Sequence, residues 1–282
     1  MKYKNREPIL KEVVKNGVLF LTYPQLEETG LVKHGFSTRM GGVSEGIFAS
    51  MNLSFSRGDD DENVRENFRR IAKALEVEPD SFVFSQQTHT TNVRKVTLED
   101  KGKGVTKPLD YRDVDGLITN VPGLCLTTFY ADCVPLFLVD PVHRAIGLSH
   151  SGWRGTVGKI GQVTLRKMQE EYGTCPADVI AAIGPSICQD CYEVSEEVIL
   201  EFQRAFDKKY WDSLYYKKEN GKYQLDLWRA NKVVLEEAGV RKEQIAVTNV
   251  CTSCNSEVLF SHRASNGRRG NLAAFLALKQ EG

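Results

Sequence analysis

Three residue types that commonly bind transition metals, His89, Cys133 and His150, lie far apart in the chain, each where an apolar run meets a small or polar turn. One thiol and two imidazoles form a nitrogen and sulfur donor set that suits zinc or copper. Three protein ligands with an open fourth position are typical of a catalytic zinc rather than a structural one. A fold that uses this set must bring three distant chain segments to one place, which constrains the architecture strongly.

The pattern of apolar residues predicts an α/β fold with mixed sheets. A helix is predicted over 61–75, where Val64, Phe68, Ile71 and Leu75 recur at helical spacing after acidic capping residues. Because strands outnumber helices, we expect a layered fold in a single domain over residues 1–282. The predicted strands are 18–23, 31–37, 82–84, 92–96, 116–119, 124–130, 136–139, 144–148, 179–183 and 245–250, the other helices are 157–172, 195–206 and 226–238, and the charged segment 208–223 is predicted to be a solvated insertion.

The charge balance argues against polyanionic partners. The chain has 37 basic and 37 acidic residues, and no long run of one sign. Nucleic acids and anionic membranes are usually bound by a basic patch, so neither is an expected partner. The charged residues 1–8 do not resemble a signal peptide, and no segment has the roughly 20 apolar residues of a membrane helix. We therefore expect a cytoplasmic protein.

The Cys and His residues support two different enzyme hypotheses. In the first, His89, Cys133 and His150 bind a catalytic metal. In the second, Cys133 is the nucleophile of a cysteine hydrolase, activated by His89 or His150, with a muropeptide or another amide as substrate. A binding or assembly protein without chemistry would leave this set unexplained. An ordinary cysteine is more often a buried structural thiol, so it is the two histidines in similar settings that make Cys133 a candidate.

Four further residues are candidates for supporting roles. Arg39 and Arg154 lie in glycine-bearing turns, and Arg154 also opens a predicted helix, so both could bind an anion such as phosphate. Asp115 lies in an acidic turn that could be a simple hairpin. Together with Asp132, it could instead orient a metal-binding histidine. No Walker or dinucleotide-binding motif is present in the sequence, so ATP and NAD are not expected.

Two Cys-x-x-Cys pairs, Cys188/Cys191 and Cys251/Cys254, raise the question of a four-cysteine zinc site. Compact zinc ribbons place two such pairs about 15–20 residues apart. Here a predicted strand and two predicted helices separate the pairs. We therefore expect independent buried thiols rather than a shared metal.

A series of short blocks spans most of the chain in consistent order: Gly35–Gly46, Met51–Leu53, Gly58–Asp60, Gln86–His89, Asp113–Gly116, Ala131–Pro135, His150–Gly155, Ala182–Pro185, Cys191–Val194, Cys251–Thr252 and Phe260–Arg263. Taken together, these blocks resemble one family, the YfiH/YlmD-like proteins. The chain departs from the family at His262, where many relatives carry tyrosine, and at Cys254, which is additional.

The resemblance implies a four-layer α/β/β/α fold and a metal, zinc or alternatively copper, bound by His89, Cys133 and His150. Such proteins were formerly described as laccase-type polyphenol oxidases and are now regarded as purine nucleoside phosphorylases with adenosine deaminase activity. The implied substrates are adenosine, inosine and S-methyl-5'-thioadenosine with inorganic phosphate, and a homodimer is the assembly to test. The older oxidase description fits poorly, because a multicopper laccase needs many more histidines than the five in this chain.

Overall fold

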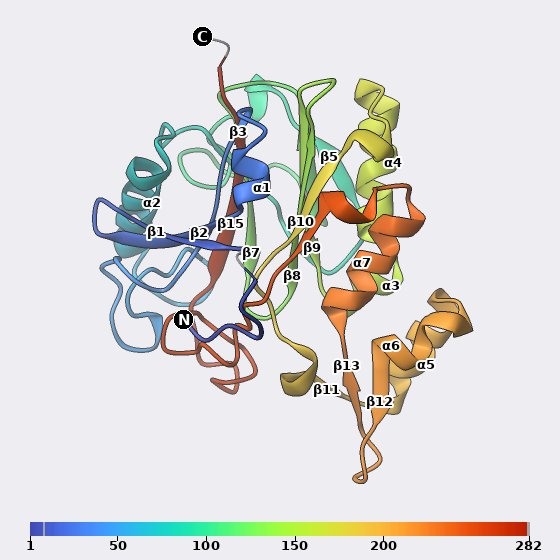
Figure 1. The fold of residues 1–282 in the computed structure, drawn as a ribbon. Coiled ribbons are helices and arrows are strands. Elements are labelled where there is room, and N and C mark those ends of the chain that lie inside the picture. Colours follow the sequence, from blue (N-terminus) through green and yellow to red (C-terminus); the bar gives the residue numbers. More distant parts are fainter. Residues whose placement is uncertain (8, 281–282) are drawn as a thin grey trace.

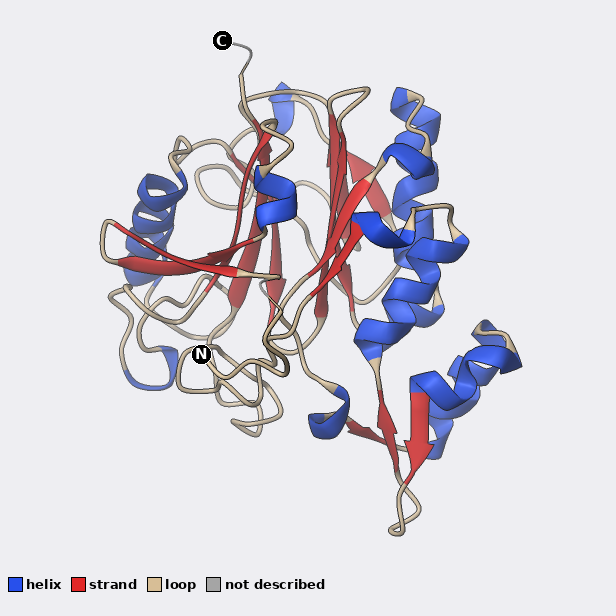
Figure 2. Ribbon diagram, in the orientation of Figure 1, coloured by secondary structure: helices blue, strands red, loops and turns tan. Residues whose placement is uncertain are grey.

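Two six-stranded mixed sheets form the centre of the computed structural model, which describes residues 1–7 and 9–280 (Figures 1 and 2). The first sheet has the order β1 (Lys11–Lys15), β2 (Val18–Thr22), β3 (Val32–Ser37), β15 (Leu272–Leu278), β7 (Cys125–Tyr130) and β4 (Phe82–Phe84). The second has the order β14 (Ile245–Val247), β10 (Ile180–Ile183), β8 (Val134–Asp140), β9 (Ala145–Ser151), β6 (Gly116–Thr119) and β5 (Val93–Lys95). The two sheets face each other.

Helices cover the outer face of each sheet. Helix α2 (Asp61–Leu75) packs on β2 and β3 of the first sheet, and α4 (Ile160–Tyr172) and α7 (Leu227–Glu237) pack on β9 and β14 of the second. Figure 1 shows the resulting order of helix, sheet, sheet and helix. The predicted α/β fold with mixed sheets is therefore confirmed, and its layers follow the α/β/β/α order. The remaining helices are α1 (Pro24–Glu27), α3 (Trp153–Val157), α5 (Glu196–Ala205) and α6 (Trp211–Leu214).

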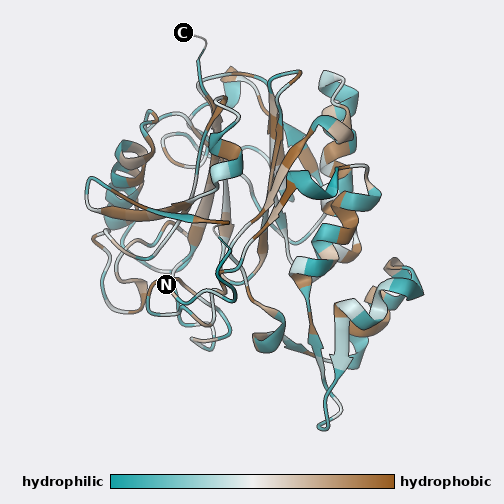
Figure 3. Cartoon of the chain, in the orientation of Figure 1, coloured by the Kyte–Doolittle hydropathy of each residue, from teal (hydrophilic) through white to brown (hydrophobic). Residues whose placement is uncertain are grey.

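Apolar side chains from both sheets fill the space between them. Phe36 of β3 and Leu126 of β7 belong to the same buried cluster as Phe137 of β8 and Leu148 of β9. Every residue of β8 and β9 is buried, because the sheet lies between the other sheet and the helices. Strands covered on both faces need apolar residues throughout rather than in alternation, as the hydropathy colours show (Figure 3).

Capping residues and left-handed backbone conformations set the ends of two predicted helices. Helix α2 has the predicted bounds: the Asp60 carboxylate accepts the backbone N–H of Glu62 at 2.7 Å, and Glu76 ends the helix with a left-handed φ of 58°. The helix predicted over 157–172 is instead two helices, α3 and α4. Lys159 separates them with a φ of 56°, which a continuous α-helix cannot contain.

Most residues of the predicted solvated insertion, 208–223, are exposed, but the segment is ordered and attached to the core. This segment contains α6 and β12 (Tyr215–Lys217), and β12 pairs with β13 (Tyr223–Leu225) in a small sheet completed by β11 (Glu193–Val194). Its charged residues face solvent, while its buried Leu214 joins the core of the second sheet, together with Leu225 at the end of β13. The sequence analysis predicted none of the strands β1, β11, β12, β13 and β15. Among the described residues, no helix combines the length and apolar character needed to span a bilayer.

Strand directions bring several loops to one edge of the second sheet. Strand β8 runs antiparallel to β9 and β10, so the start of β8 lies beside the ends of both. The start of β6 also lies beside the end of β9, with Gly116 opposite Ser149. Asp115, Cys133 and His150 therefore occupy the same edge, and the functional groups described below gather there.

Candidate metal and substrate site

The structure brings His89, Cys133 and His150 together. Their ligand atoms all lie within 4.8 Å of one another, and 3.9 Å separates Cys133 Sγ from His89 Nε2. His89 lies in the turn after β4 and Cys133 in the turn between β7 and β8. His150 lies inside β9, which extends to Ser151 and is longer than the predicted strand 144–148. The donor set therefore comes from three segments that meet only through the sheet order.

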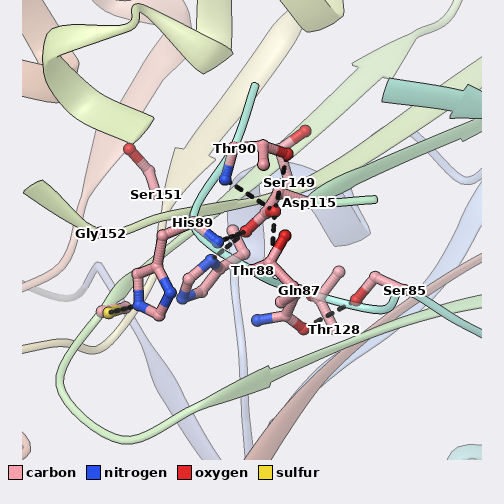
Figure 4. Close-up of polar contacts among 12 residues, drawn as sticks. Ser85, Gln87, Thr88, His89, Thr90, Asp115, Thr128, Ser149, Ser151 and Gly152 are labelled. Atoms are coloured by element: carbon pink, nitrogen blue, oxygen red, sulfur yellow. Dashed lines mark hydrogen bonds and ion pairs between the residues drawn. The ribbon is translucent and has the colours of Figure 1, made fainter. Parts of the chain in front are cut away.

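One buried carboxylate, Asp115, bonds to both histidines. Figure 4 shows Asp115 beside Thr88, His89 and Thr90. Its Oδ1 accepts His150 Nδ1 at 2.8 Å and the backbone N–H of His89 at 3.1 Å. Its Oδ2 accepts the backbone N–H groups of Thr88 at 3.0 Å and Thr90 at 2.9 Å. His89 has a left-handed φ of 65°, a conformation that these bonds to the turn stabilise. Since Nδ1 of His150 is engaged, Nε2 is the ring nitrogen left for a metal or substrate.

The charges of the cluster favour an ionised thiol. Burial would raise the pKa of Cys133, but His150 and His89 outweigh it and lower the pKa to about 6. Burial would lower the pKa of His150, but Cys133 and Asp115 raise it to about 9. Metal binding requires the thiolate, so the surroundings of Cys133 already favour the form that binds a metal. Soft thiolate and imidazole donors at this spacing fit zinc or copper.

Gly152 leaves the space that the cluster needs. A Cβ atom at this position would lie 2.9 Å from His89 Cδ2 and 3.2 Å from Cys133 Sγ. The φ of Gly152 is −74°, which any residue can adopt, so the requirement for glycine is steric rather than conformational. The glycine at the start of α3 is therefore part of the geometry of the site.

We expect Gly152→Ala to displace His89 or Cys133 and to lower both metal affinity and turnover by about 10–100-fold, the range seen when the support of a metal ligand is disturbed. Metal titration and steady-state kinetics measure the two effects. Gly155→Ala is the matched control, because its Cβ would meet nothing closer than 3.4 Å. Equal behaviour of the two variants would show that Gly152 does not shape the site.

The cluster opens into a cavity of about 430 Å³. This volume lies within the range of small-molecule sites. Its apolar lining includes Leu53, Phe55, Phe84, Leu109, Phe129 and Tyr130, and its polar lining includes Ser54, Ser56, Arg57, Ser85, Gln86, Gln87, Arg269 and Asn271 beside the cluster of His89, Cys133 and His150. Aromatic walls with polar groups at defined positions suit a planar heterocycle with a polar substituent.

The two arginines predicted to bind phosphate do not line this cavity. Arg39 donates to the carbonyl oxygens of Ala49 at 2.6 Å and Ser256 at 3.1 Å, and its guanidinium lies 4.6 Å from the Phe260 ring centroid. Arg154 is exposed and lies over the ring of Trp153 at 4.2 Å. In this geometry Arg39 ties loops together and Arg154 covers an aromatic ring, and their phosphate-binding role stays a prediction.

The arginines that do line the cavity are Arg57 and Arg269, which the sequence analysis did not name. Burial lowers the pKa of Arg269 to about 10, and the charge of Arg57 adds to this shift. Within residues 1–7 and 9–280, neither arginine forms an ion pair with a carboxylate. Arg57 directly precedes Gly58, and Arg269 directly precedes Gly270. The criterion that selected Arg154, an arginine in a glycine-bearing turn, would therefore also have selected them.

Asp132 does not contact a histidine, as the sequence analysis considered, but bonds to two other loops. Its carboxylate accepts Thr252 Oγ1 at 2.6 Å and the backbone N–H of Arg263 at 2.7 Å. Asp132 therefore braces the loop that carries Cys133, whereas Asp115 contacts the histidines.

The expectation of independent thiols at the two Cys-x-x-Cys pairs is wrong. The four sulfur atoms of Cys188, Cys191, Cys251 and Cys254 lie within 4.8 Å of one another. The pairs follow β10 and β14, which are adjacent parallel strands, so their loops meet at the same edge despite the long separation in sequence. Linear spacing was a poor guide because the sheet, and not a compact ribbon, brings the pairs together.

Comparison with known proteins agrees with this architecture. Purine nucleoside phosphorylase YlmD of Bacillus subtilis is 37% identical over 87% of this chain and 88% of its own length. Purine nucleoside phosphorylase of Bacteroides thetaiotaomicron is 38% identical over 89% of this chain and 93% of its own. The mouse purine nucleoside phosphorylase LACC1 is 30% identical over 95% of this chain, which spans 60% of that longer protein.

Solved structures match nearly the whole chain. YlmD from Geobacillus stearothermophilus superposes with a TM-score of 0.88 at 34% identity, covering 96% of this chain and 99% of that one. The Bacillus licheniformis protein YfiH gives a TM-score of 0.89 at 32% identity, covering 97% and 100%. A family model described as multi-copper polyphenol oxidoreductase laccase matches residues 33–279. The chain therefore belongs to this laccase-type family, together with the YfiH and YlmD proteins.

Proposed function

We propose that this protein is a metal-dependent purine nucleoside phosphorylase. It would convert adenosine, inosine and S-methyl-5'-thioadenosine with inorganic phosphate to the free base and the corresponding sugar 1-phosphate, and it would also deaminate adenosine. The observation that carries the proposal is a three-ligand cluster opening into a heterocycle-sized cavity. Relatives of the same family that bear the name purine nucleoside phosphorylase support it.

The metal ligands in this proposal are His89 Nε2, Cys133 Sγ and His150 Nε2. Zinc is the expected ion, with copper as the alternative, because both accept imidazole and thiolate donors. A bound zinc supplies Lewis acidity and lowers the pKa of a coordinated water towards about 7, which is the chemistry that deamination at C6 of adenine requires. Asp115 would orient the His150 ring through Nδ1 and hold the turn of His89 through its backbone N–H, and its five bonds of 2.8–3.1 Å support this role.

The cavity walls offer contacts for the purine base. Phe84 and Phe129 pack edge to face, with their ring centroids 4.7 Å apart, and together form an aromatic wall. Gln86 and Asn271 place amide groups in the same cavity, where they could bond to the edge of the base. These residues would hold the purine base of the nucleoside against the aromatic wall.

Phosphorolysis needs a bound phosphate beside the sugar. A phosphate oxygen forms a bond to C1' as the C1'–N9 bond breaks, and the base leaves with the electron pair and then takes a proton. Arg57 and Arg269 would bind the phosphate, because an anion between them offsets their mutual repulsion and gives each guanidinium a charged partner. In this proposal Arg57 and Arg269 make the phosphate contact that the sequence analysis predicted for Arg39 and Arg154.

We expect Arg57→Ala to weaken apparent phosphate affinity by roughly 10–100-fold, because one charge-assisted contact is worth ~1.5–3 kcal/mol. Arg57 is exposed, so its loss should not disturb folding. Arg154→Ala is the matched control, an exposed arginine outside the cavity. Adenosine conversion is followed at varied phosphate, separating adenine from inosine. Deamination needs no phosphate, so its rate should change less. If Arg154→Ala weakened phosphate affinity and Arg57→Ala did not, Arg154 would be the phosphate ligand and the assignment to Arg57 would be wrong.

A cysteine hydrolase is the second candidate, favoured by the low pKa of Cys133 beside a histidine that Asp115 orients. In such an enzyme Cys133 would be the nucleophile, His150 the base and Asp115 the group that orients the base. A thiolate that binds a metal is not free to act as a nucleophile, so the metal content of active enzyme separates the two candidates.

The test of the proposed function is phosphate-dependent release of the base. Purified protein with adenosine or inosine should produce free base and ribose 1-phosphate with phosphate present, and no free base when phosphate is omitted. Inosine formed from adenosine measures deamination in the same assay. Base release that does not depend on phosphate would contradict phosphorolysis.

A further inference from the structure

We infer that Cys188, Cys191, Cys251 and Cys254 form a second metal site, a structural zinc centre distinct from the cluster at His89. The four sulfur atoms lie within 4.8 Å of one another. Around a tetrahedral zinc with bonds of about 2.3 Å, sulfur atoms are about 3.8 Å apart, so modest movements would close the set. Four thiolates leave no position open, which is the pattern of a structural rather than a catalytic zinc.

The fold positions the two halves of this site independently of any metal. Strands β10 and β14 pair in parallel, with Ile183 opposite Val247, and each is followed by one Cys-x-x-Cys loop. The pairing continues past the strands as a bridge between Ser186 and Cys251, where the Thr252 N–H donates to the Ser186 carbonyl at 3.1 Å. Two adjacent backbone segments therefore present their cysteines to each other.

Hydrogen bonds to sulfur support metal binding. The Cys251 Sγ accepts the backbone N–H of Cys188 at 3.3 Å and that of Cys254 at 3.4 Å. A neutral thiol is a weak acceptor, whereas a thiolate bound to a metal gains from N–H groups directed at it. On the other side of the set, Cys191 Sγ and Cys254 Sγ are 3.5 Å apart. The backbone of both loops therefore folds around the sulfur atoms.

Two basic residues contact the first cysteine loop, beside the place where four thiolates around a divalent ion would carry a net negative charge. The Lys4 ammonium interacts with Cys188 and forms an ion pair with Asp190 at 2.8 Å. Arg263 donates to the carbonyl oxygens of Cys191 at 3.1 Å and Glu193 at 2.9 Å. Both cations hold the first cysteine loop near the position where the excess charge would lie.

Two hydrogen bonds to Asp132 connect the four-cysteine set to the candidate active site. Thr252, between the two cysteines of the second pair, donates its hydroxyl to Asp132 at 2.6 Å, and Asp132 directly precedes Cys133. The Asp132 carbonyl also accepts the N–H of Ile187, next to Cys188, at 3.0 Å. Asp132 has a left-handed φ of 87°, so its loop needs such support. Zinc at the four cysteines would therefore stabilise the loop that positions Cys133.

The experiment measures zinc per chain in protein purified without added chelator. We expect Cys254→Ser to carry one zinc fewer than the unaltered protein while keeping the zinc bound at His89, Cys133 and His150. His150→Ala should lose the other zinc and keep this one. Cys175→Ser is the matched control, because Cys175 is exposed and belongs to neither set, and it should keep the full zinc content. The comparison separates failure at one site from failure at the other.

A second measurement on the unaltered protein covers the case in which Cys254→Ser fails to fold. Alkylation followed by mass spectrometry should show all four cysteines protected, and a zinc chelator should expose them together. After cobalt replacement, an intense thiolate-to-cobalt absorption should persist in Cys133→Ser. A disulfide between Cys191 and Cys254, alkylation without chelator, or an unchanged zinc content in a folded Cys254→Ser variant would overturn the site. Iron in place of zinc would overturn the choice of metal.

Discussion

Replacement of Cys133 by serine should abolish nucleoside turnover and remove the metal from the His89 site in the same variant. The thiolate is the soft donor of the set, and its surroundings lower its pKa to about 6 so that it can bind a metal. Changes to outer contacts of metal ligands cost about 10–100-fold, so we expect losing a ligand to lower turnover by more than about 100-fold. Zinc per chain and kcat, measured on the same preparation, test both effects.

The two enzyme hypotheses differ in this experiment. A cysteine hydrolase would lose amide hydrolysis in Cys133→Ser but keep its metal content, since the thiol would act as nucleophile and not as ligand. Cys125→Ser offers a buried control, because Cys125 lies in β7 and belongs to neither metal-ligand set. Full zinc occupancy at the His89 site in Cys133→Ser would contradict the metal-dependent phosphorylase.

Local patterns in the sequence were sufficient for the helix α2 and for the strands β4 and β6, whose bounds agree with the structure. These elements have clear periodicity and capping residues or turns at their ends. The sequence could not show which strands are neighbours, because pairing between distant segments depends on packing of the whole chain. The parallel pairing of β10 with β14 brings the four distant cysteines together, and their spacing along the sequence does not contain that information.

The metal ligands of the candidate site could be predicted from the sequence, but the arginines that line the cavity could not. His89, Cys133 and His150 could be chosen because their residue types are rare and each follows a strand signal. Arginine is common, so a glycine-bearing turn did not distinguish Arg39 and Arg154 from Arg57 and Arg269, and only the cavity separates them. Asp115 and Asp132 were both candidates to orient a histidine, yet one contacts the histidines and the other contacts Thr252.

Asp115 offers a test of how the histidines are held, because a single carboxylate accepts five hydrogen bonds from four residues, His150, His89, Thr88 and Thr90. Asparagine has nearly the same shape, but it replaces one accepting oxygen with an NH₂ donor that would face N–H groups. We expect Asp115→Asn to lower zinc affinity at this site and turnover by about 10–100-fold. Losing hydrogen bonds to a charged, buried acceptor should also lower the free energy of unfolding by about 1.5–3 kcal/mol.

Asp113→Asn is the matched control for this variant. Asp113 lies in the same acidic turn and accepts Thr88 Oγ1 at 2.7 Å, but it is exposed and bonds to neither histidine. Zinc titration, kcat and urea unfolding on both variants separate an effect on the site from an effect on the turn. If the two variants lost zinc affinity and turnover equally, the turn as a whole would matter and the specific role of Asp115 would be wrong. If Asp115→Asn lost stability but kept zinc affinity, the carboxylate would hold the turn without orienting the ligands.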